Sequence, residues 1–254
     1  MPTTGSERRR AALVTGASYG IGAAIAAGLA ADGFDVAVTD LETGSLGKTV
    51  AAIEAAGRRA VTVALDLRSQ QSVEAGFDAA VEGLGGLDVL VNNAGIPMTR
   101  PATEVTRAEW DTALTVNLTG NFFMCQQMGR HLISADRAGS IVSLASTHGT
   151  VGFPNTIAYG VAKAGISHMT RILAIEWAPY DIRVNAVAPG TTETESRAPM
   201  LADPERRRMM LDRIPLRRFG RADEMAAAVR YLVSPQAAYI TGQVLLLDGG
   251  LTAY

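Results

Sequence analysis

Residues 12–22 read Ala-Leu-Val-Thr-Gly-Ala-Ser-Tyr-Gly-Ile-Gly, a short apolar run that leads directly into a glycine-rich loop. An alanine-rich helix is expected to follow over residues 21–31, with Gly33 ending it. Glycines let such a loop turn tightly and let a pyrophosphate approach the helix N-terminus, where free N–H groups and the helix dipole favour negative charge. A glycine cluster is also typical of a tight turn with close packing. Its position between a strand and a helix strengthens the phosphate-binding interpretation.

The same alternation of strand and helix continues along the chain. Apolar runs predict seven strands, at residues 12–15, 34–39, 60–65, 87–91, 140–144, 182–188 and 244–247. Helices are predicted between them at residues 21–31, 45–56, 69–82, 107–134, 156–178 and 223–233, the fourth with a break near Gly120. Continuous apolar strands are typical of strands covered on both faces. We therefore expect an α/β fold of the Rossmann type, a doubly wound parallel sheet of about seven strands with helices on both faces.

Composition indicates one compact domain over residues 1–254, with the irregular and partly helical residues 191–220 as a substrate-binding loop or lid. The chain is 48% hydrophobic, and its net charge of −2 does not suit a nucleic-acid-binding protein. No apolar run reaches the roughly 18 residues that cross a membrane. Cys125 is the only cysteine, which excludes an internal disulfide and suits a reducing cytosol. We expect a cytoplasmic protein that binds neither nucleic acid nor membrane.

Tyr159 and Lys163 are candidate catalytic residues because of their spacing. Four residues apart on a helix, the phenol and the ammonium lie on one face. A free phenol has a pKa of roughly 10, and a fixed cation nearby lowers it. The pair therefore suits proton exchange with a carbonyl/alcohol couple. Taken alone, so short a pattern is more often a solvated helix face.

Asp40 bears on the choice of cofactor. It ends the second predicted strand, 18 residues beyond Gly22. An acid there can accept hydrogen bonds from ribose hydroxyls and repels a 2′-phosphate. Tyr19, inside the glycine loop, supplies no cation for an extra phosphate. NAD is therefore predicted over NADP.

Three other motifs do not support a function. Gly47-Lys48-Thr49 resembles the end of a Walker A loop but has Glu42 where the first glycine is required. Asn117-Leu118-Thr119 matches a glycosylation sequon, and nothing suggests secretion. The three histidines do not have metal-ligand spacing, so no metal site is expected.

Together these residues resemble the short-chain dehydrogenase/reductase family, from Thr15 to Gly250. The quoted glycine loop resembles its cofactor motif, and Asn92-Asn93-Ala94-Gly95 is similar to its strand-four signature. Pro189-Gly190 and the closing Leu247-Asp248-Gly249-Gly250 also fit. Ala145 departs from the pattern, since many members carry a second serine there.

The resemblance implies a role for each matching residue. Tyr159 would be the general acid and base, with Lys163 lowering its pKa and holding the nicotinamide ribose. Ser146 would hydrogen-bond the substrate oxygen, and Asn117 would hold a water that relays protons; the alternatives are a strand-end cap for Ser146 and a backbone-bonded amide for Asn117. The implied cofactor contacts are Gly16, Ser18, Tyr19, Gly20, Ile21, Gly22, Asp40, Asp66, Leu67, Asn93, Ala94, Gly95, Tyr159, Lys163, Pro189, Gly190, Thr192 and Thr194.

The predicted reaction transfers a hydride between NAD(H) and a small alcohol or ketone. His148, Phe153, Asn155 and Glu193 are the candidate substrate contacts, and the polar members suit a sugar or polyol. The arginines at 206, 207, 208 and 213 would instead attract an anionic substrate or carrier, as in a 3-oxoacyl reductase, or form the solvated face of a lid. A cofactor-binding protein without turnover is the alternative class. The resemblance also implies a homotetramer that pairs long helices and C-terminal strands.

Overall fold

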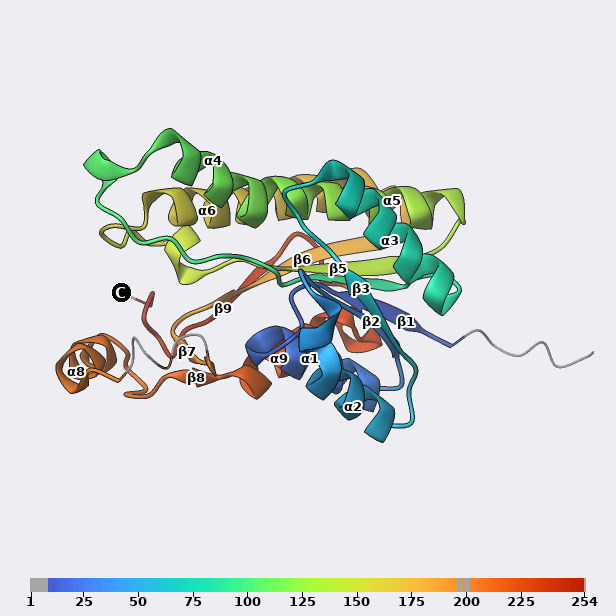
Figure 1. Cartoon of the computed structure of the whole chain (residues 1–254), viewed down its shortest axis with the longest axis horizontal. Helices are drawn as coiled ribbons and strands as arrows, with labels where there is room; N and C mark the ends of the chain where they lie inside the picture. The colour runs from blue at the N-terminus through green and yellow to red at the C-terminus, as the bar shows by residue number, and fades with distance from the viewer. Residues whose placement is uncertain (1–8, 196–197, 199–201, 254) are drawn as a thin grey trace, which may run out of the picture.

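A seven-stranded parallel sheet forms the centre of the molecule (Figure 1), in a computed structural model that describes residues 9–195, 198 and 202–253. The strand order is β3-β2-β1-β4-β5-β6-β9, and every neighbouring pair is parallel. The bounds are β1 (Ala11–Val14), β2 (Asp35–Asp40), β3 (Ala60–Ala64), β4 (Val89–Asn92), β5 (Gly139–Leu144), β6 (Ile182–Pro189) and β9 (Val244–Leu247). The predicted doubly wound sheet is confirmed, and each predicted strand lies within two residues of its observed bounds.

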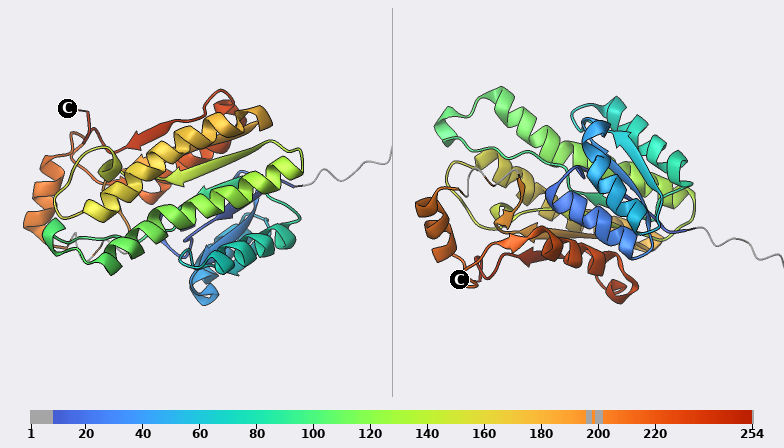
Figure 2. Two further views of the ribbon diagram at one scale, coloured as in Figure 1. Left: turned by 90° about the horizontal axis from the view of Figure 1, so that it is seen from above. Right: turned by 60° about the horizontal axis from the view of Figure 1, so that its bottom comes forward.

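Helices cover both faces of the sheet. One face carries α1 (Gly20–Ala31), α2 (Gly47–Ala55) and α9 (Ala222–Val233), and the other carries α3 (Gln70–Leu84), α4 (Arg107–Leu114), α5 (Gly120–Ser134) and α6 (Ile157–Trp177). Figure 2 shows α5 and α6 side by side across the second face. The strands are apolar on both sides because both sides are packed, and consecutive residues of β1 such as Leu13 and Val14 lie in opposite cores.

The long helix predicted over residues 107–134 is interrupted by a π-helical turn, Thr115–Thr119, between α4 and α5. The next residue is Gly120, where a β-carbon would lie 2.6 Å from the carbonyl oxygen of Leu67. The helix therefore passes very close to the loop that follows β3. The predicted break near Gly120 is confirmed, and its form is a widened turn that contains Asn117.

The segment after β6, which the sequence predicts to be a substrate-binding loop or lid, lies at the carboxyl end of the sheet. Its described parts are a two-stranded ribbon of β7 (Thr192–Glu193) and β8 (Gly220–Arg221), and the helix α8 (Pro204–Asp212). Asp203 caps α8 by accepting hydrogen bonds from the N–H groups of Glu205 and Arg206. In Figure 1, α8 lies beyond the end of the sheet. We call residues 202–221 the lid below.

Candidate active site

The glycine loop between β1 and α1 is a close-packed turn. Gly16 and Gly20 both have positive φ, of 63° and 60°. A β-carbon at Gly16 would lie 2.8 Å from Ala94 Cα, and one at Gly22 would lie 2.4 Å from Asn93 Nδ2. Glycine is required at these positions because the loop after β4 lies directly against the turn.

The N-terminus of α1 is open to an anion. Tyr19 occupies the N-cap position without a capping side-chain hydrogen bond, and the first turn, which includes Ile21, holds no acidic residue. The first N–H groups of the helix therefore keep their capacity to bind a phosphate. Asn93 fixes the loop by donating from Nδ2 to the carbonyl oxygens of Thr15 (2.9 Å) and Gly16 (2.7 Å). These features fit the diphosphate of a dinucleotide.

Asp40 and Asp66 end two neighbouring strands beside this loop. Asp40 accepts hydrogen bonds from the Ser18 hydroxyl and from the N–H of Leu41. Within the described part of the chain it forms no ion pair. Asp66 is paired with Arg68 at 2.7 Å, and hydrogen bonds from Arg68 lower the pKa of this aspartate.

Lys163 is buried in the centre of the site. Its side chain lies on α6 and its Nζ donates a 2.6 Å hydrogen bond to the carbonyl oxygen of Leu144, at the end of β5. Burial lowers the pKa of the lysine from 10.5 to about 8. Nζ is 5.7 Å from the centre of the Tyr159 ring, one helical turn earlier. The solvated-face alternative therefore does not hold for Lys163, which is 4% exposed.

Ser146 and His148 follow β5 and face the same space. The Ser146 hydroxyl oxygen accepts a hydrogen bond from the N–H of His148 (3.2 Å) and lies 3.4 Å from His148 Nδ1, where the tautomer of the imidazole sets which group donates. The His148 ring contacts the Tyr159 ring edge-on, with centres 5.5 Å apart. Ser146 therefore caps the local backbone, as the alternative interpretation expected, and is joined to Tyr159 through His148, which contacts both.

Asn117 is fully buried and joins the π-helical turn to the loop after β4. Its Oδ1 accepts from the N–H of Ile96, and its Nδ2 donates to the carbonyl oxygens of Ile96 and Ala113, each at 3.0 Å. A β-carbon at Gly95 would lie 2.6 Å from Asn117 Oδ1 and 3.6 Å from Lys163 Nζ. The amide is thus bonded to backbone, next to the buried ammonium.

The segment after β6 packs against both the chain that follows β9 and the glycine loop. A β-carbon at Gly190 would lie 3.0 Å from Asp248 Cα, so Pro189-Gly190 packs directly on the chain that follows β9. Thr192 is buried, and Thr194 lies against the glycine loop, with its Cγ2 3.2 Å from where a β-carbon of Gly20 would be. The Glu195 carboxylate lies beside the same glycine, with Oε2 3.9 Å from that β-carbon position.

Of the four candidate substrate contacts, His148 contacts the Tyr159 ring and Phe153 packs on His148. The Phe153 ring stacks on the His148 ring with centres 4.2 Å apart. Asn155 has a positive φ of 63° and its carbonyl oxygen accepts a 2.7 Å hydrogen bond from the N–H of Arg100. Glu193 is exposed and paired with Arg207 on the lid at 3.1 Å. The Glu193 carboxylate is therefore engaged on residues 202–221, whereas the contact of Asn155 uses its backbone carbonyl and not its side chain.

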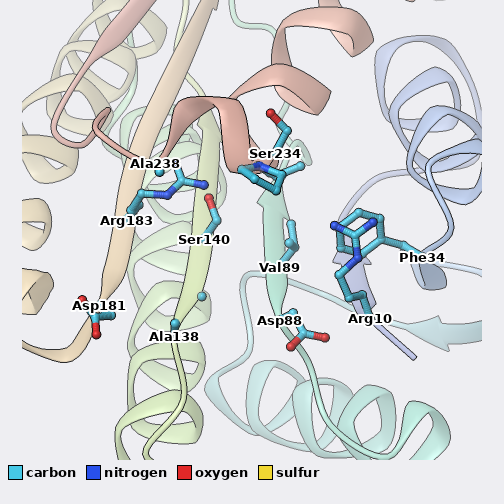
Figure 3. A pocket seen from close by; sticks show the side chains of 13 residues that line it. Arg10, Phe34, Asp88, Val89, Ala138, Ser140, Asp181, Arg183, Ser234 and Ala238 are labelled. Atoms are coloured by element: carbon cyan, nitrogen blue, oxygen red, sulfur yellow. The ribbon is translucent and has the colours of Figure 1, made fainter. Parts of the chain in front are cut away.

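A cavity of about 230 Å³ lies at the opposite end of the sheet. Figure 3 shows Arg10, Asp88, Ser140 and Arg183 around it, and all four lie at or before the amino ends of strands. Arg183 donates to the carbonyl oxygens of Leu232 and Ile240, which ties β6 to the end of α9. Ligands of such sheets bind at the carboxyl ends of the strands, so we assign the site to the carboxyl edge.

Three further observations bear on the type of site. Burial raises the pKa of the Cys125 thiol to about 12, so this cysteine is a core residue rather than a nucleophile. Among the residues that the structure describes, no group of three His, Cys, Asp or Glu side chains is arranged to hold a metal. Over the same residues, none of the helices combines the length and apolar character needed to span a membrane.

Comparisons with known proteins agree with this geometry. Residues 16–252 match the protein-family model described as Enoyl-(Acyl carrier protein) reductase. The chain is 41% identical to 3beta-hydroxysteroid dehydrogenase 1 of Eggerthella lenta, over 95% of this chain and 93% of that protein. It is also 41% identical to cis-4-hydroxycyclohexanecarboxylate dehydrogenase of Sinomonas cyclohexanicum, over 96% and 97%. Among solved structures, a candidate 2-deoxy-D-gluconate 3-dehydrogenase from Agrobacterium tumefaciens with bound NADP matches with a TM-score of 0.90 and 36% identity, covering 96% and 97% of the two chains.

Proposed function

The chain belongs to the short-chain dehydrogenase/reductase family, and we propose that it transfers a hydride between NAD(H) and a secondary alcohol or the corresponding ketone. The observation that carries this proposal is the grouping of Ser146, Tyr159 and Lys163 at the carboxyl edge of the sheet, next to an open anion-binding helix end. The dehydrogenase names of the two 41% identical relatives support the reaction class.

In this mechanism Tyr159 exchanges the proton. During oxidation the alcohol loses its hydroxyl proton to the Tyr159 phenolate, and in reduction the phenol returns it to the carbonyl oxygen. Lys163 stabilises the phenolate because its ammonium is fixed one turn away by the bond to Leu144. When bound, NAD would accept the hydride that leaves the carbon bearing the hydroxyl group of the alcohol.

Ser146 and Asn117 have supporting roles in the proposal. The serine hydroxyl, oriented by the N–H of His148, donates a hydrogen bond to the substrate oxygen as negative charge develops there. Both donors of the Asn117 amide are already used by backbone carbonyls. A proton-relay water would therefore bind at the main chain of the π-helical turn, with the side chain holding that turn in place.

We propose NAD rather than NADP as the physiological cofactor, on the strength of Asp40. Replacing Asp40 with alanine is expected to reduce the preference of kcat/KM for NAD over NADP by about 10- to 100-fold, because a carboxylate that repels a 2′-phosphate and bonds the ribose is lost. The measurement is initial rate against each cofactor at matched ionic strength.

Glu42→Gln is the matched control for this change. Glu42 is an exposed acid two residues beyond Asp40 and has no side-chain capping bond. We expect it to leave the cofactor ratio unchanged. Equal wild-type efficiency with NAD and NADP would contradict the assignment. Because one similar solved structure holds NADP, the wild-type efficiencies with NAD and NADP are the comparison that decides the cofactor preference.

The test of the proposed reaction is NADH formation from alcohols and NADH consumption with ketones. The panel contains sugars, sugar acids, polyols, cyclic secondary alcohols and 3-oxoacyl thioesters. Turnover of a cyclic alcohol or sugar supports the dehydrogenase proposal, and turnover of thioesters alone replaces it with a 3-oxoacyl reductase. NADH binding without turnover of any class would favour a binding protein.

We also propose that the chain is a cytoplasmic homotetramer. The outer face of α6 exposes Ile172 and Ile175, the latter 77% exposed. The edge strand β9 exposes Leu245 and Leu246, and an uncovered apolar edge strand is prone to pair with another chain. Light scattering is expected to give four times the monomer mass of 26.6 kDa. A monomer mass at micromolar concentration would contradict the assembly.

A further inference from the structure

The imidazole of His148 lies between the side chain proposed to exchange the proton and the one proposed to bind the substrate oxygen. His148 Nδ1 is 3.4 Å from the Ser146 hydroxyl oxygen, and the His148 ring meets the Tyr159 ring edge-on, with centres 5.5 Å apart. The backbone N–H of the same histidine donates to the Ser146 hydroxyl oxygen at 3.2 Å. Within the described residues, both hydrogen-bond partners of that hydroxyl are therefore atoms of His148.

Close packing on α6 fixes the backbone of this histidine. His148 lies in the short 3-10 helix η4 (Thr147–Gly149). A β-carbon at Gly160 would lie 3.0 Å from the His148 carbonyl oxygen, and one at Gly149 would lie 2.6 Å from the carbonyl carbon of Lys163. Because both positions are glycine, the turn lies directly on the helix that carries the proposed proton donor.

A second ring fixes the plane of the imidazole. The Phe153 ring stacks on the His148 ring with centres 4.2 Å apart and an interplanar angle of 26°. The Arg213 guanidinium carbon lies 5.2 Å from the centre of the Phe153 ring, so Phe153 is itself held by a neighbour. The imidazole is thus oriented by packing, with Nδ1 close to the serine.

The contact between Nδ1 and Ser146 can run in either direction, and both directions hold the serine. When Nδ1 carries no proton, it accepts the proton of the hydroxyl. At 3.4 Å this bond is long, so a substrate oxygen at a shorter distance can take that proton over. When Nδ1 is protonated, it donates to the Ser146 oxygen, which then accepts two hydrogen bonds and directs its own proton away from the imidazole.

We propose that His148 is a positioning residue of this site, whose Nδ1 holds the Ser146 hydroxyl in the direction from which it donates to the substrate oxygen. The inference rests on the proposed dehydrogenase function and gives His148 a role beyond that of a substrate contact. The imidazole acts through Ser146 and takes no part in the bond changes. Its contribution is the orientation of a donor toward developing negative charge.

Two substitutions separate the hydrogen bond from the packing. His148→Asn keeps a polar atom near the position of Nδ1 and loses the ring, whereas His148→Phe keeps a ring beside Phe153 and Tyr159 and loses the nitrogen. We expect His148→Phe to lower kcat about 10-fold with KM for the alcohol within about threefold, because the bond acts as charge develops on the substrate oxygen. His148→Asn is expected to keep at least about three times the kcat of His148→Phe.

The kinetics use saturating NAD and the alcohol of the panel above that the wild type oxidises fastest. A Ser146→Ala background isolates the contact. If His148 acts through the serine, His148→Phe should change the residual kcat of Ser146→Ala by less than about twofold. NADH fluorescence titration and thermal unfolding of each variant show whether the cofactor site and the fold remain intact.

An independent readout needs no turnover. With isotope-labelled histidine, the side-chain nitrogen resonance of His148 Nδ1, assigned by its absence in His148→Asn, is expected to shift between wild type and Ser146→Ala in the cofactor-free protein. An unchanged resonance would contradict the contact, even where a His148 variant fails to fold.

Three kinetic results would overturn the positioning role and leave the dehydrogenase function standing. They are an unchanged kcat in His148→Phe, a His148→Asn enzyme no faster than His148→Phe, and equal losses with and without Ser146. The second would show that the ring serves packing alone. Absence of wild-type turnover across the whole panel, with NADH still bound, would overturn the proposed function and this role together.

Discussion

Replacing Tyr159 with phenylalanine is expected to lower kcat by about 1,000-fold in both reaction directions while leaving NADH affinity within about threefold. The change removes one oxygen from a half-buried ring, so the ring contact with His148 remains. General acid–base catalysis by one positioned group contributes about 10²–10⁴-fold. The residual rate comes from the cofactor and the bound orientation, which the variant keeps.

The measurement is single-substrate kinetics beside NADH fluorescence titration on the same samples. Tyr180→Phe provides the control, because Tyr180 is a 50% exposed tyrosine that follows α6. A Tyr159→Phe enzyme that keeps more than about a tenth of wild-type kcat would exclude Tyr159 as the proton donor. Loss of NADH binding would instead indicate a damaged site.

Replacing Lys163 with methionine should strongly lower kcat without destabilising the fold. Lysine and methionine have similar length, and the position is 4% exposed. Lowering the Lys163 pKa from 10.5 to about 8 corresponds to about 3 kcal/mol against folding at neutral pH. The lost hydrogen bond to Leu144 offsets about 1–2 kcal/mol of that gain. We expect kcat to fall at least about 100-fold while the free energy of unfolding rises by about 1 kcal/mol.

The pH dependence of stability gives an independent check on Lys163. Below pH 8, Lys163 is protonated in both the folded and the unfolded wild-type protein. Burial of its ammonium therefore lowers the free energy of unfolding by its full amount in this range. Between pH 8 and 10.5 the unfolded lysine keeps its proton and the folded one loses it, so this penalty disappears as pH rises. The stability advantage of Lys163→Met should therefore shrink across this range.

Denaturant unfolding of the cofactor-free protein at pH 7 and pH 9.5 measures this difference. Lys48→Met is the control, since Lys48 is the other lysine of the chain and is exposed on α2. It should change neither activity nor the pH slope. A Lys163→Met protein that is less stable than wild type at pH 7 would mean that the lysine stabilises the fold, contrary to the burial argument.

The succession of strands and helices along the chain and the parallel character of the sheet were predictable because they depend on local signals. Each strand is an apolar run, some helices have an ending signal such as Gly33, and right-handed crossovers then give a parallel sheet. Candidate residues at strand ends, such as Asp40 and Ser146, share one edge of the sheet for the same reason. This grouping needed no knowledge of distant contacts.

Other features of the site depend on residues far apart in the chain. The π-helical turn at Asn117 exists where helix α5 passes Leu67, fifty residues earlier in sequence, and where Ile96 binds the amide. Nothing in the helical pattern of residues 107–134 predicts that form. Similarly, Glu193 is a polar residue in a suitable segment, and only the fold pairs it with Arg207.

The sequence by itself determined the doubly wound sheet, the glycine loop before α1 and the helical spacing of Tyr159 and Lys163, because each follows from residue type and short-range periodicity. The tertiary structure decided the burial that lowers the pKa of Lys163. It also decided that the Arg213 guanidinium lies over the Phe153 ring. Desolvation and pairing are set by neighbours brought together from distant segments, and no local pattern contains that information.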